Sequence, residues 1–409
     1  QGNDEDVKGK PFNRILLSHI SSMCNRKGFP KKSDVEAFLN LSCLKADWQG
    51  NDEYVKNKPL NQELVTHISS MYCGKGFPKK ADVEAFLNIS CLKADWQEGN
   101  DAAVKNKPLD QKLIANISSM CHRKGLPDEK KLKDFLKLPC LKAGWQGNDD
   151  NAQGKLLDRK LVTHISSMCS GKGIPDNDKV KAFLNMPCLK EGWLGKDDDA
   201  NGKPLNEKLI SRISSMCHGK GLTENEKVKA FLNLPCLKAG WQGKDDDIKN
   251  KPLNEELISR ISSMYHHKGL PENKEVENCL RLPCLKEGWL GKDGDVQDKP
   301  LNEELISRIS SMCHDKGFPE NKEVEAFLNI PCLREGWEKG KDDAVRDKPF
   351  NRILLSHISQ MYHAQGLPEK KRVETLTLEV AFGKEENYFK DFLPNIQSLG
   401  LSSRRTADY

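Results

Sequence analysis

The stretch Leu301–Trp337 reads LNEELISRISSMCHDKGFPENKEVEAFLNIPCLREGW, and versions of it fill almost the whole 409-residue chain. Self-similarity at a fixed period of this size is typical of a tandem repeat array, in which each repeat buries its apolar face against its neighbours. The methionine of this stretch recurs every 48 or 49 residues and numbers repeats 1 to 8: Met23, Met71, Met120, Met168, Met216, Met264, Met312 and Met361.

Each repeat carries the signals of two helices. Asn302 is an N-cap residue, and apolar residues over 305–313 recur with helical spacing. Gly317 predicts the end of the first helix, Pro319 the start of the second and Pro331 its end. The remaining residues up to the Trp are long enough for a short third turn. Since no strand pattern appears, we predict an all-α, right-handed superhelical solenoid of eight repeats.

Departures from the common repeat mark both ends of the array. Ser42 and Ser90 replace the proline in repeats 1 and 2, so there we expect the second helix to run on. Repeat 8 stops matching after Val373, which predicts a repeat array over 1–373 and a C-terminal cap with a polar tail over 374–409. The other repeats carry a Trp that we expect to pack at the junction with the next repeat: Trp48, Trp96, Trp145, Trp193, Trp241, Trp289 and Trp337.

The composition is polar and mildly basic. Charged residues make up 31%, hydrophobic ones 37%, and the mean hydropathy is −0.68, as expected of a thin solenoid. The net charge of +5 permits a nucleic-acid partner without demanding one. No apolar run approaches the ~18 residues that a membrane helix needs, and no signal peptide is evident. We expect a monomer that does not enter membranes.

Fourteen cysteines raise the question of disulfides. Cys313 and Cys332 lie at opposite ends of a helical hairpin, farther apart than the roughly 7 Å between Cα atoms that a disulfide allows. Reduced, buried thiols therefore predict an intracellular protein, in the nucleus or delivered into a host cell. Disulfides between successive repeats keep the secreted alternative open.

Catalytic and metal sites have little support. Most Ser, Cys, His and acidic residues recur in every repeat, which suits structure or binding better than one active site. Neighbours such as Cys313-His314 point about 100° apart on a helix and lack a second ligand pair, and the run Asp197–Asp199 lacks a closing Glu. We predict no enzyme, no cofactor and no metal.

The second and third residues after each repeat's methionine differ in all eight repeats, whereas Ser-Ser-Met before them and Lys-Gly after them hardly change. A variable pair between fixed flanks, in the turn between two helices, is how a modular reader presents one specificity element per repeat. The pairs are Asn25-Arg26, Cys73-Gly74, His122-Arg123, Ser170-Gly171, His218-Gly219, His266-His267, His314-Asp315 and His363-Ala364.

Around this pair the chain resembles the repeats of transcription-activator-like effectors, helical hairpins in which a residue pair at this turn reads one DNA base. The combinations His-Asp, His-Gly, His-Ala and His-His are similar to that family's vocabulary. The repeat is longer than the family's and has Lys-Gly where the family has Gly-Gly. The resemblance implies modular readout of successive bases by these pairs, and DNA over RNA.

A lysine follows the pair in seven repeats, and in a solenoid equivalent residues line up along one edge. Such a row could track phosphates, beside the free N–H groups that begin each second helix. We therefore expect a nucleic-acid-binding solenoid; the alternatives are a scaffold whose concave face grips a protein or peptide, and simple drift of exposed residues. The candidate phosphate-binding residues are Lys27, Lys75, Lys124, Lys172, Lys220, Lys268 and Lys316.

Overall fold

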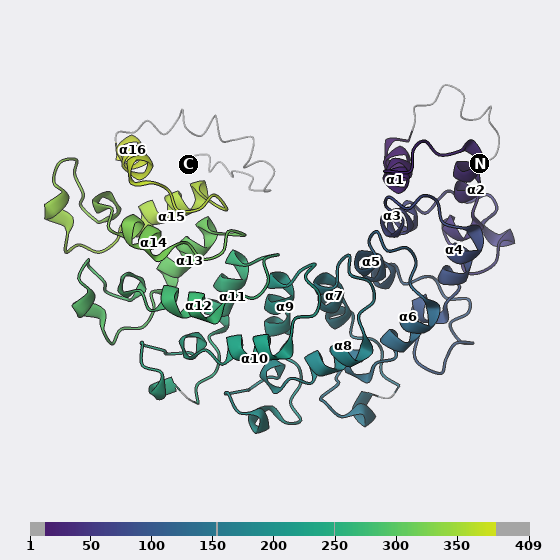
Figure 1. Ribbon diagram of the computed structural model, residues 1–409, viewed down its shortest axis with the longest axis horizontal. Coiled ribbons are helices and arrows are strands. Elements are labelled where there is room, and N and C mark those ends of the chain that lie inside the picture. The colour runs from purple at the N-terminus through teal and green to yellow at the C-terminus, as the bar shows by residue number, and fades with distance from the viewer. Residues whose placement is uncertain (1–12, 153, 249, 382–409) are drawn as a thin grey trace, which may run out of the picture. The chain divides into compact units, whose positions relative to one another are not determined.

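The computed structural model describes residues 13–152, 154–248 and 250–381 (Figure 1). These residues form α-helices and short 3-10 helices without a β-strand, which confirms the predicted all-α repeat architecture. The first helices of the repeats are α1 Arg14–Cys24, α3 Gln62–Met71, α5 Gln111–Met120, α7 Arg159–Met168, α9 Glu207–Met216, α11 Glu255–Met264, α13 Glu303–Met312 and α15 Arg352–Met361. The second helices are α2 Lys32–Leu39, α4 Lys80–Leu87, α6 Glu129–Leu136, α8 Asn177–Leu184, α10 Asn225–Leu232, α12 Asn273–Leu280, α14 Asn321–Leu328 and α16 Lys370–Ala381.

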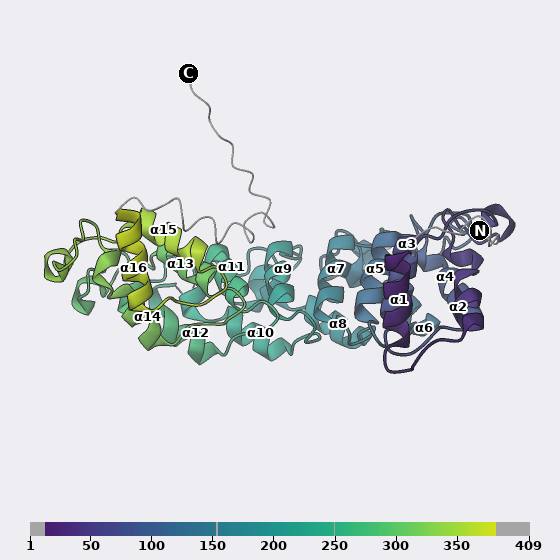
Figure 2. The same cartoon turned by 90° about the horizontal axis from the view of Figure 1, so that it is seen from above.

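The chain divides into an N-terminal part, residues 1–277, and a C-terminal part, residues 278–409, with the boundary inside α12. In the N-terminal part the first helices stack in sequence order from α1 to α11, with the second helices in a separate row (Figures 1 and 2). In the C-terminal part α13 packs on α15. The expected boundary between array and cap, at residues 373 and 374, falls inside α16, and the polar tail lies outside the described residues.

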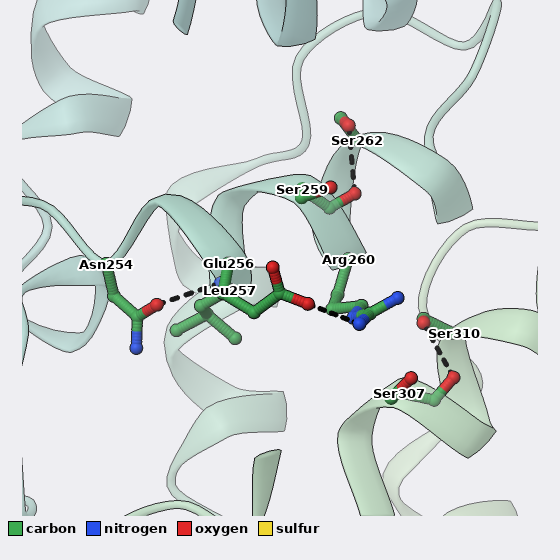
Figure 3. Close-up of polar contacts among 8 residues, drawn as sticks. All are labelled: Asn254, Glu256, Leu257, Ser259, Arg260, Ser262, Ser307 and Ser310. Atoms are coloured by element: carbon green, nitrogen blue, oxygen red, sulfur yellow. Dashed lines mark hydrogen bonds and ion pairs between the residues drawn. The ribbon is translucent and has the colours of Figure 1, made fainter. Parts of the chain in front are cut away.

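Each first helix is capped as the sequence predicts. The Asn302 side chain accepts a hydrogen bond from the N–H of Leu305 at 3.0 Å, which satisfies one of the donors that a helix N-terminus leaves free. Figure 3 shows the equivalent bond from Leu257 to Asn254. The end of the helix differs from the expectation, because α13 stops at Met312, well before Gly317.

The second helix and the third turn follow the predicted order. Helix α14 has Glu320 as its N-cap, one residue after Pro319, and a 3-10 turn over Pro331–Leu333 comes after it. Repeats 1 and 2 form the same 3-10 turn at Ser42–Leu44 and Ser90–Leu92, so the expected longer helix there is wrong. The residue before the turn is buried in an extended conformation in each of repeats 1 to 7, and this packing ends the helix whether or not a proline follows.

The core of each repeat contains the methionine, the apolar stripes of both helices and the Trp. Six of the seven Trp side chains are only 2–5% exposed, while Trp337 is half-buried. Burial at the junctions confirms the predicted packing of Trp in those six repeats. None of the fourteen cysteines, all of which are described, forms a disulfide, and twelve of them are buried. Among the described residues no helix is long and apolar enough to cross a membrane.

Candidate nucleic-acid interface at the turns

The variable pair and its lysine lie in the turn that follows each first helix. All seven lysines after the pair are exposed. The second residue of the pair is exposed at Arg26, Arg123, His267 and Asp315, whereas the first residue is half-buried in repeats 2 to 7. In repeats 1 to 7 this turn therefore presents an exposed lysine, and the second residue of the pair precedes it.

The second residue of the pair adopts a left-handed backbone in every repeat. Its φ is 59° at Arg123 and 68° at Gly171, a region that L-residues other than glycine rarely occupy. The Gly171 N–H donates to the Ser119 carbonyl of the preceding repeat at 2.9 Å, and the Gly173 N–H donates to the Met120 carbonyl at 2.8 Å. Two N–H groups of the turn are thus directed to the neighbouring repeat, whereas those of Ser170 and Lys172 donate to Ser167 and Cys169 of their own repeat. The bonds to the neighbour interrupt the helical pattern, and the helix ends early.

This backbone link recurs through the array. It is made by the second residue of the pair and the middle residue of Ser-Ser-Met in the preceding repeat, at 2.9–3.2 Å: Gly74 to Ser22, Arg123 to Ser70, Gly171 to Ser119, Gly219 to Ser167, His267 to Ser215 and Ala364 to Ser311. The link uses only backbone atoms, so it constrains conformation and leaves the side chain free to vary.

The first residue of the pair bonds the same serine through its side chain. The distance from His218 Nδ1 to Ser167 Oγ is 2.8 Å, and that from His122 Nδ1 to Ser70 Oγ is 3.0 Å. Burial lowers the pKa of both imidazoles, which favours the neutral form at pH 7. Where the residue is Ser170, its hydroxyl accepts from Ser119 at 3.3 Å. The first residue therefore joins neighbouring repeats, a role that the sequence did not reveal.

The first serine of Ser-Ser-Met is also part of the joint. It is buried, and its hydroxyl donates to the carbonyl three residues earlier, as Figure 3 shows for Ser262 and Ser310. In four joints it also bonds a polar side chain of the preceding repeat's first helix: His19 to Ser69, His67 to Ser118, Asn116 to Ser166 and His164 to Ser214, at 3.0–3.2 Å. The fixed Ser-Ser-Met flank is thus explained by contacts between repeats.

Side chains of neighbouring turns touch each other. The ring centroids of His218 and His267 lie 4.3 Å apart in a T-shaped contact, although the two residues belong to successive repeats. Those of His314 and His363 lie 5.3 Å apart. The Cys73 thiol has a lowered pKa, owing first to a hydrogen bond with Ser22 and also to Arg123 of the next repeat. The variable pairs of successive repeats therefore contact each other at these three joints.

A second row of cations is buried in repeats 2 to 7, at the last position of the motif Cys-Leu-Lys or Cys-Leu-Arg. Lys190 is 6% exposed, and its Nζ lies 4.1 Å from the ring centroid of Trp145 in the preceding repeat. Lys93, Lys142 and Lys238 occupy equivalent places over Trp48, Trp96 and Trp193, at 4.6–5.0 Å. An ammonium over an indole face is attracted by the ring's electrons.

The backbone of this buried cation is fixed by one antiparallel bridge per repeat, between the cation and the residue that follows the linker proline, as in Lys190 with Leu205. In the C-terminal part Arg334 takes the place of lysine: its guanidinium lies 5.1 Å from the Trp289 centroid, and its Nη1 donates to the Lys348 carbonyl at 3.1 Å. Sequence analysis missed this row, because lysine and arginine are seldom buried. The only sequence signal for this row was the recurrence of a lysine or arginine directly after Cys-Leu.

In the part of the chain that the structure describes, no three His, Cys, Asp or Glu residues are placed to hold a metal ion together. No family model, no curated protein and no solved structure matches the chain.

Proposed function

We propose that this protein is a modular nucleic-acid-binding solenoid, with DNA as the favoured partner, in which the exposed lysine of each turn holds a phosphate. The second residue of each variable pair then faces a base. The observation that carries the proposal is the exposure of all seven lysines at equivalent positions of a repeating turn. Phosphates recur along a nucleic acid, so a repeating row of cations is complementary to them.

The environment of the lysines supports this role. The described residues form no ion pair with Lys172, Lys220 or Lys268, so these ammonium groups are not neutralised by the protein. The acidic runs lie elsewhere, in the linker 3-10 turns such as Asp197–Ala200, where Asp197 pairs with Lys229 at 3.0 Å.

A protein-interaction scaffold is the second candidate. It is favoured by the hydrogen bonds that join the first residue of the pair to the neighbouring repeat, as between His218 and Ser167. If the pair serves mainly to join repeats, its variation reflects alternative ways of making that contact. The two candidates differ in what a nucleic acid does: the first requires binding that weakens as salt rises, and the second requires none.

The test is binding of the full chain to a random oligonucleotide pool over a range of salt concentrations. Substituting Gln for Lys172, Lys220 and Lys268 together should weaken binding and reduce the slope of log K against log salt by about 0.9 for each phosphate contact on duplex DNA. The matched control substitutes Gln for Lys155, Lys203 and Lys251, exposed linker lysines of the same three repeats. Equal effects of the two triple variants, or no binding at any salt, would contradict the proposal.

Base reading is tested by Asp315→Gly in repeat 7. Asp315 is exposed and already has a φ of 60°, so glycine fits the backbone without strain. We expect a change of base preference at one position of the selected site, worth about 1–3 kcal/mol, with the other positions unchanged. Selection from a random pool with both proteins measures this. An identical selected site would remove the pair from base recognition.

A further inference from the structure

The N-terminal face of repeat 1 exposes residues that the interior joints cover. Leu17 is 47% exposed, whereas the equivalent Val65 and Ile114 are at most 2% exposed. Phe29 is fully exposed, while the residue at the same position is half-buried in most other repeats and buried at Ile174. Ser21, the first serine of Ser-Ser-Met, is also exposed here although its counterparts are buried. This face is therefore half of a joint between repeats.

The hydrogen-bond donors of the joint are also present. Arg26 and Gly28 have φ values of 72° and 83°, close to the 71° and 89° of Gly74 and Gly76, which donate to repeat 1. Among the described residues the N–H groups of Arg26 and Gly28 have no acceptor. These two N–H groups thus have the backbone conformation that interior repeats use to donate to the preceding repeat, but no such carbonyls lie opposite them among the described residues.

The cation of the joint completes the set. Lys45 occupies the position of Lys93 and makes the same antiparallel bridge, with Leu60. It is only half-buried, and no Trp ring lies beneath it among the described residues. The face thus offers an apolar patch, two N–H donors and one ammonium in the arrangement that the interior joints use.

Repeat 8 ends in a different way. In the interior the methionine carbonyl accepts the N–H of the next repeat's glycine, as Met312 does from Gly366 at 2.8 Å. The Met361 carbonyl instead accepts from Nε2 of Gln365, at 2.9 Å, within the same repeat. Gln365 stands where the other repeats have lysine, and repeat 8 also lacks the Trp. Among the described residues this end fills its own acceptor, and its sequence has no Trp, so the described part of repeat 8 does not complement the N-terminal face.

We propose that the N-terminal face of repeat 1 is a docking surface for one further helical repeat of this class. The partner repeat presents the two free carbonyls of a Ser-Ser-Met segment to Arg26 and Gly28, an apolar first helix to Leu17, and a Trp ring to Lys45. A second copy of the chain does not supply these groups, because its last repeat has a filled carbonyl and no Trp. The proposal stands whether or not the turns bind nucleic acid.

The experiment adds one repeat ahead of Gln1 in the full chain. Two extensions are compared, copies of residues 290–337 and of residues 194–241, each ending in its Trp. We expect amide hydrogen exchange at Arg26 and Gly28 to slow by about tenfold or more, toward the rates of Gly74 and Gly76. The matched control is the same extension with its Trp replaced by Ala, which should give less protection.

Unchanged exchange at Arg26 and Gly28 in either extended chain, with the added helices themselves protected, would overturn the proposal. Two different extensions guard against one that fails to fold. Sedimentation of the chain without an extension gives an independent check: it should remain monomeric as its concentration rises. Self-association that Phe29→Ser abolishes would assign the face to a second copy of the chain and would also overturn the proposal.

Discussion

Two lysine rows run through the repeats, and their surroundings are opposite. Lys172, in the turn after a first helix, is exposed, whereas Lys190, after Cys-Leu in the same repeat, is 6% exposed and covers the ring of Trp145. Both residues recur with the same period, so recurrence cannot separate a binding residue from a packing residue. The difference shows that the neighbouring repeat decides the role, because only the buried lysine faces an indole.

The largest expected loss of stability comes from removing a Trp ring beneath the row of buried lysines. Trp193→Ala should destabilise the protein by about 3–5 kcal/mol, because it removes a large side chain that is 3% exposed and leaves Lys238 without its ring. Urea unfolding, with amide exchange in α9 and α10, measures the loss. Trp337→Ala, at a half-buried Trp, is the control and should cost less. Equal losses of stability in the two variants would mean that the contact of Trp193 with the next repeat does not stabilise the protein.

A smaller effect is expected at the left-handed position of the exposed turn. Arg123→Val should destabilise by about 1–2 kcal/mol, because a β-branched residue is strained at a φ of 59°. Arg123→Gly should preserve or slightly raise stability while removing the same charge. Thermal unfolding of both variants separates conformation from charge. If both lose stability equally, the guanidinium and not the backbone accounts for the effect.

The charge of the buried row can be measured through pH. Burial lowers the pKa of Lys190 from 10.5 to about 8. Between these values the unfolded chain binds the proton that the folded chain has released, so the lysine makes the free energy of unfolding rise as pH increases from about 8 to 10.5. Buried thiols act in the opposite sense above pH 9, because burial raises the pKa of groups such as Cys188 to about 12.

The informative quantity is therefore the difference in unfolding free energy between the native protein and Lys190→Met. This difference should shift in favour of the native protein as pH rises from 8 to 10.5, because the methionine variant keeps the thiols and loses only the lysine titration. Urea unfolding at several pH values measures it. A difference independent of pH would mean that Lys190 keeps its ordinary pKa.

The smallest effect on stability is expected in the exposed row. Lys220→Met should change the free energy of unfolding by less than about 0.5 kcal/mol, because the side chain is exposed and makes no ion pair with the described residues. The same substitution should weaken oligonucleotide binding at low salt. Urea unfolding tests the expected stability, and titration with a labelled oligonucleotide tests the expected loss of binding. A clear loss of stability would place Lys220 with the packing lysines.

Much of the fold could be predicted from local pattern, because helix caps, apolar spacing and turn residues act within one repeat. The N-cap at Asn302 and the break at Pro331 are examples. The errors arose where a neighbouring repeat overrides a local signal. Gly317 predicted a later helix end, but α13 already ends at Met312. In the equivalent turn of repeat 4, the Gly171 N–H donates to Ser119 of the preceding repeat and not to its own helix.

The candidate site shows the same division. Position and variability of the pairs could be read from the sequence, and the exposure of the lysines agrees with the predicted row. The bond between His218 and Ser167 could not be predicted, because the two residues are far apart along the chain and meet only when repeats stack. Whether the pairs read bases stays a prediction.

The sequence by itself determined the period, the helical hairpin and the divergent last repeat, because each follows from residue types within a short window. Only the tertiary structure decided which lysine of a repeat is buried and that the serines of Ser-Ser-Met join two repeats. It also showed that the Gln365 side chain donates to the Met361 carbonyl in repeat 8. In repeat 1 the N–H groups of Arg26 and Gly28 have no acceptor among the described residues. The physical reason is that burial and hydrogen bonding across a joint depend on the adjacent repeat, which a single repeat's sequence does not contain.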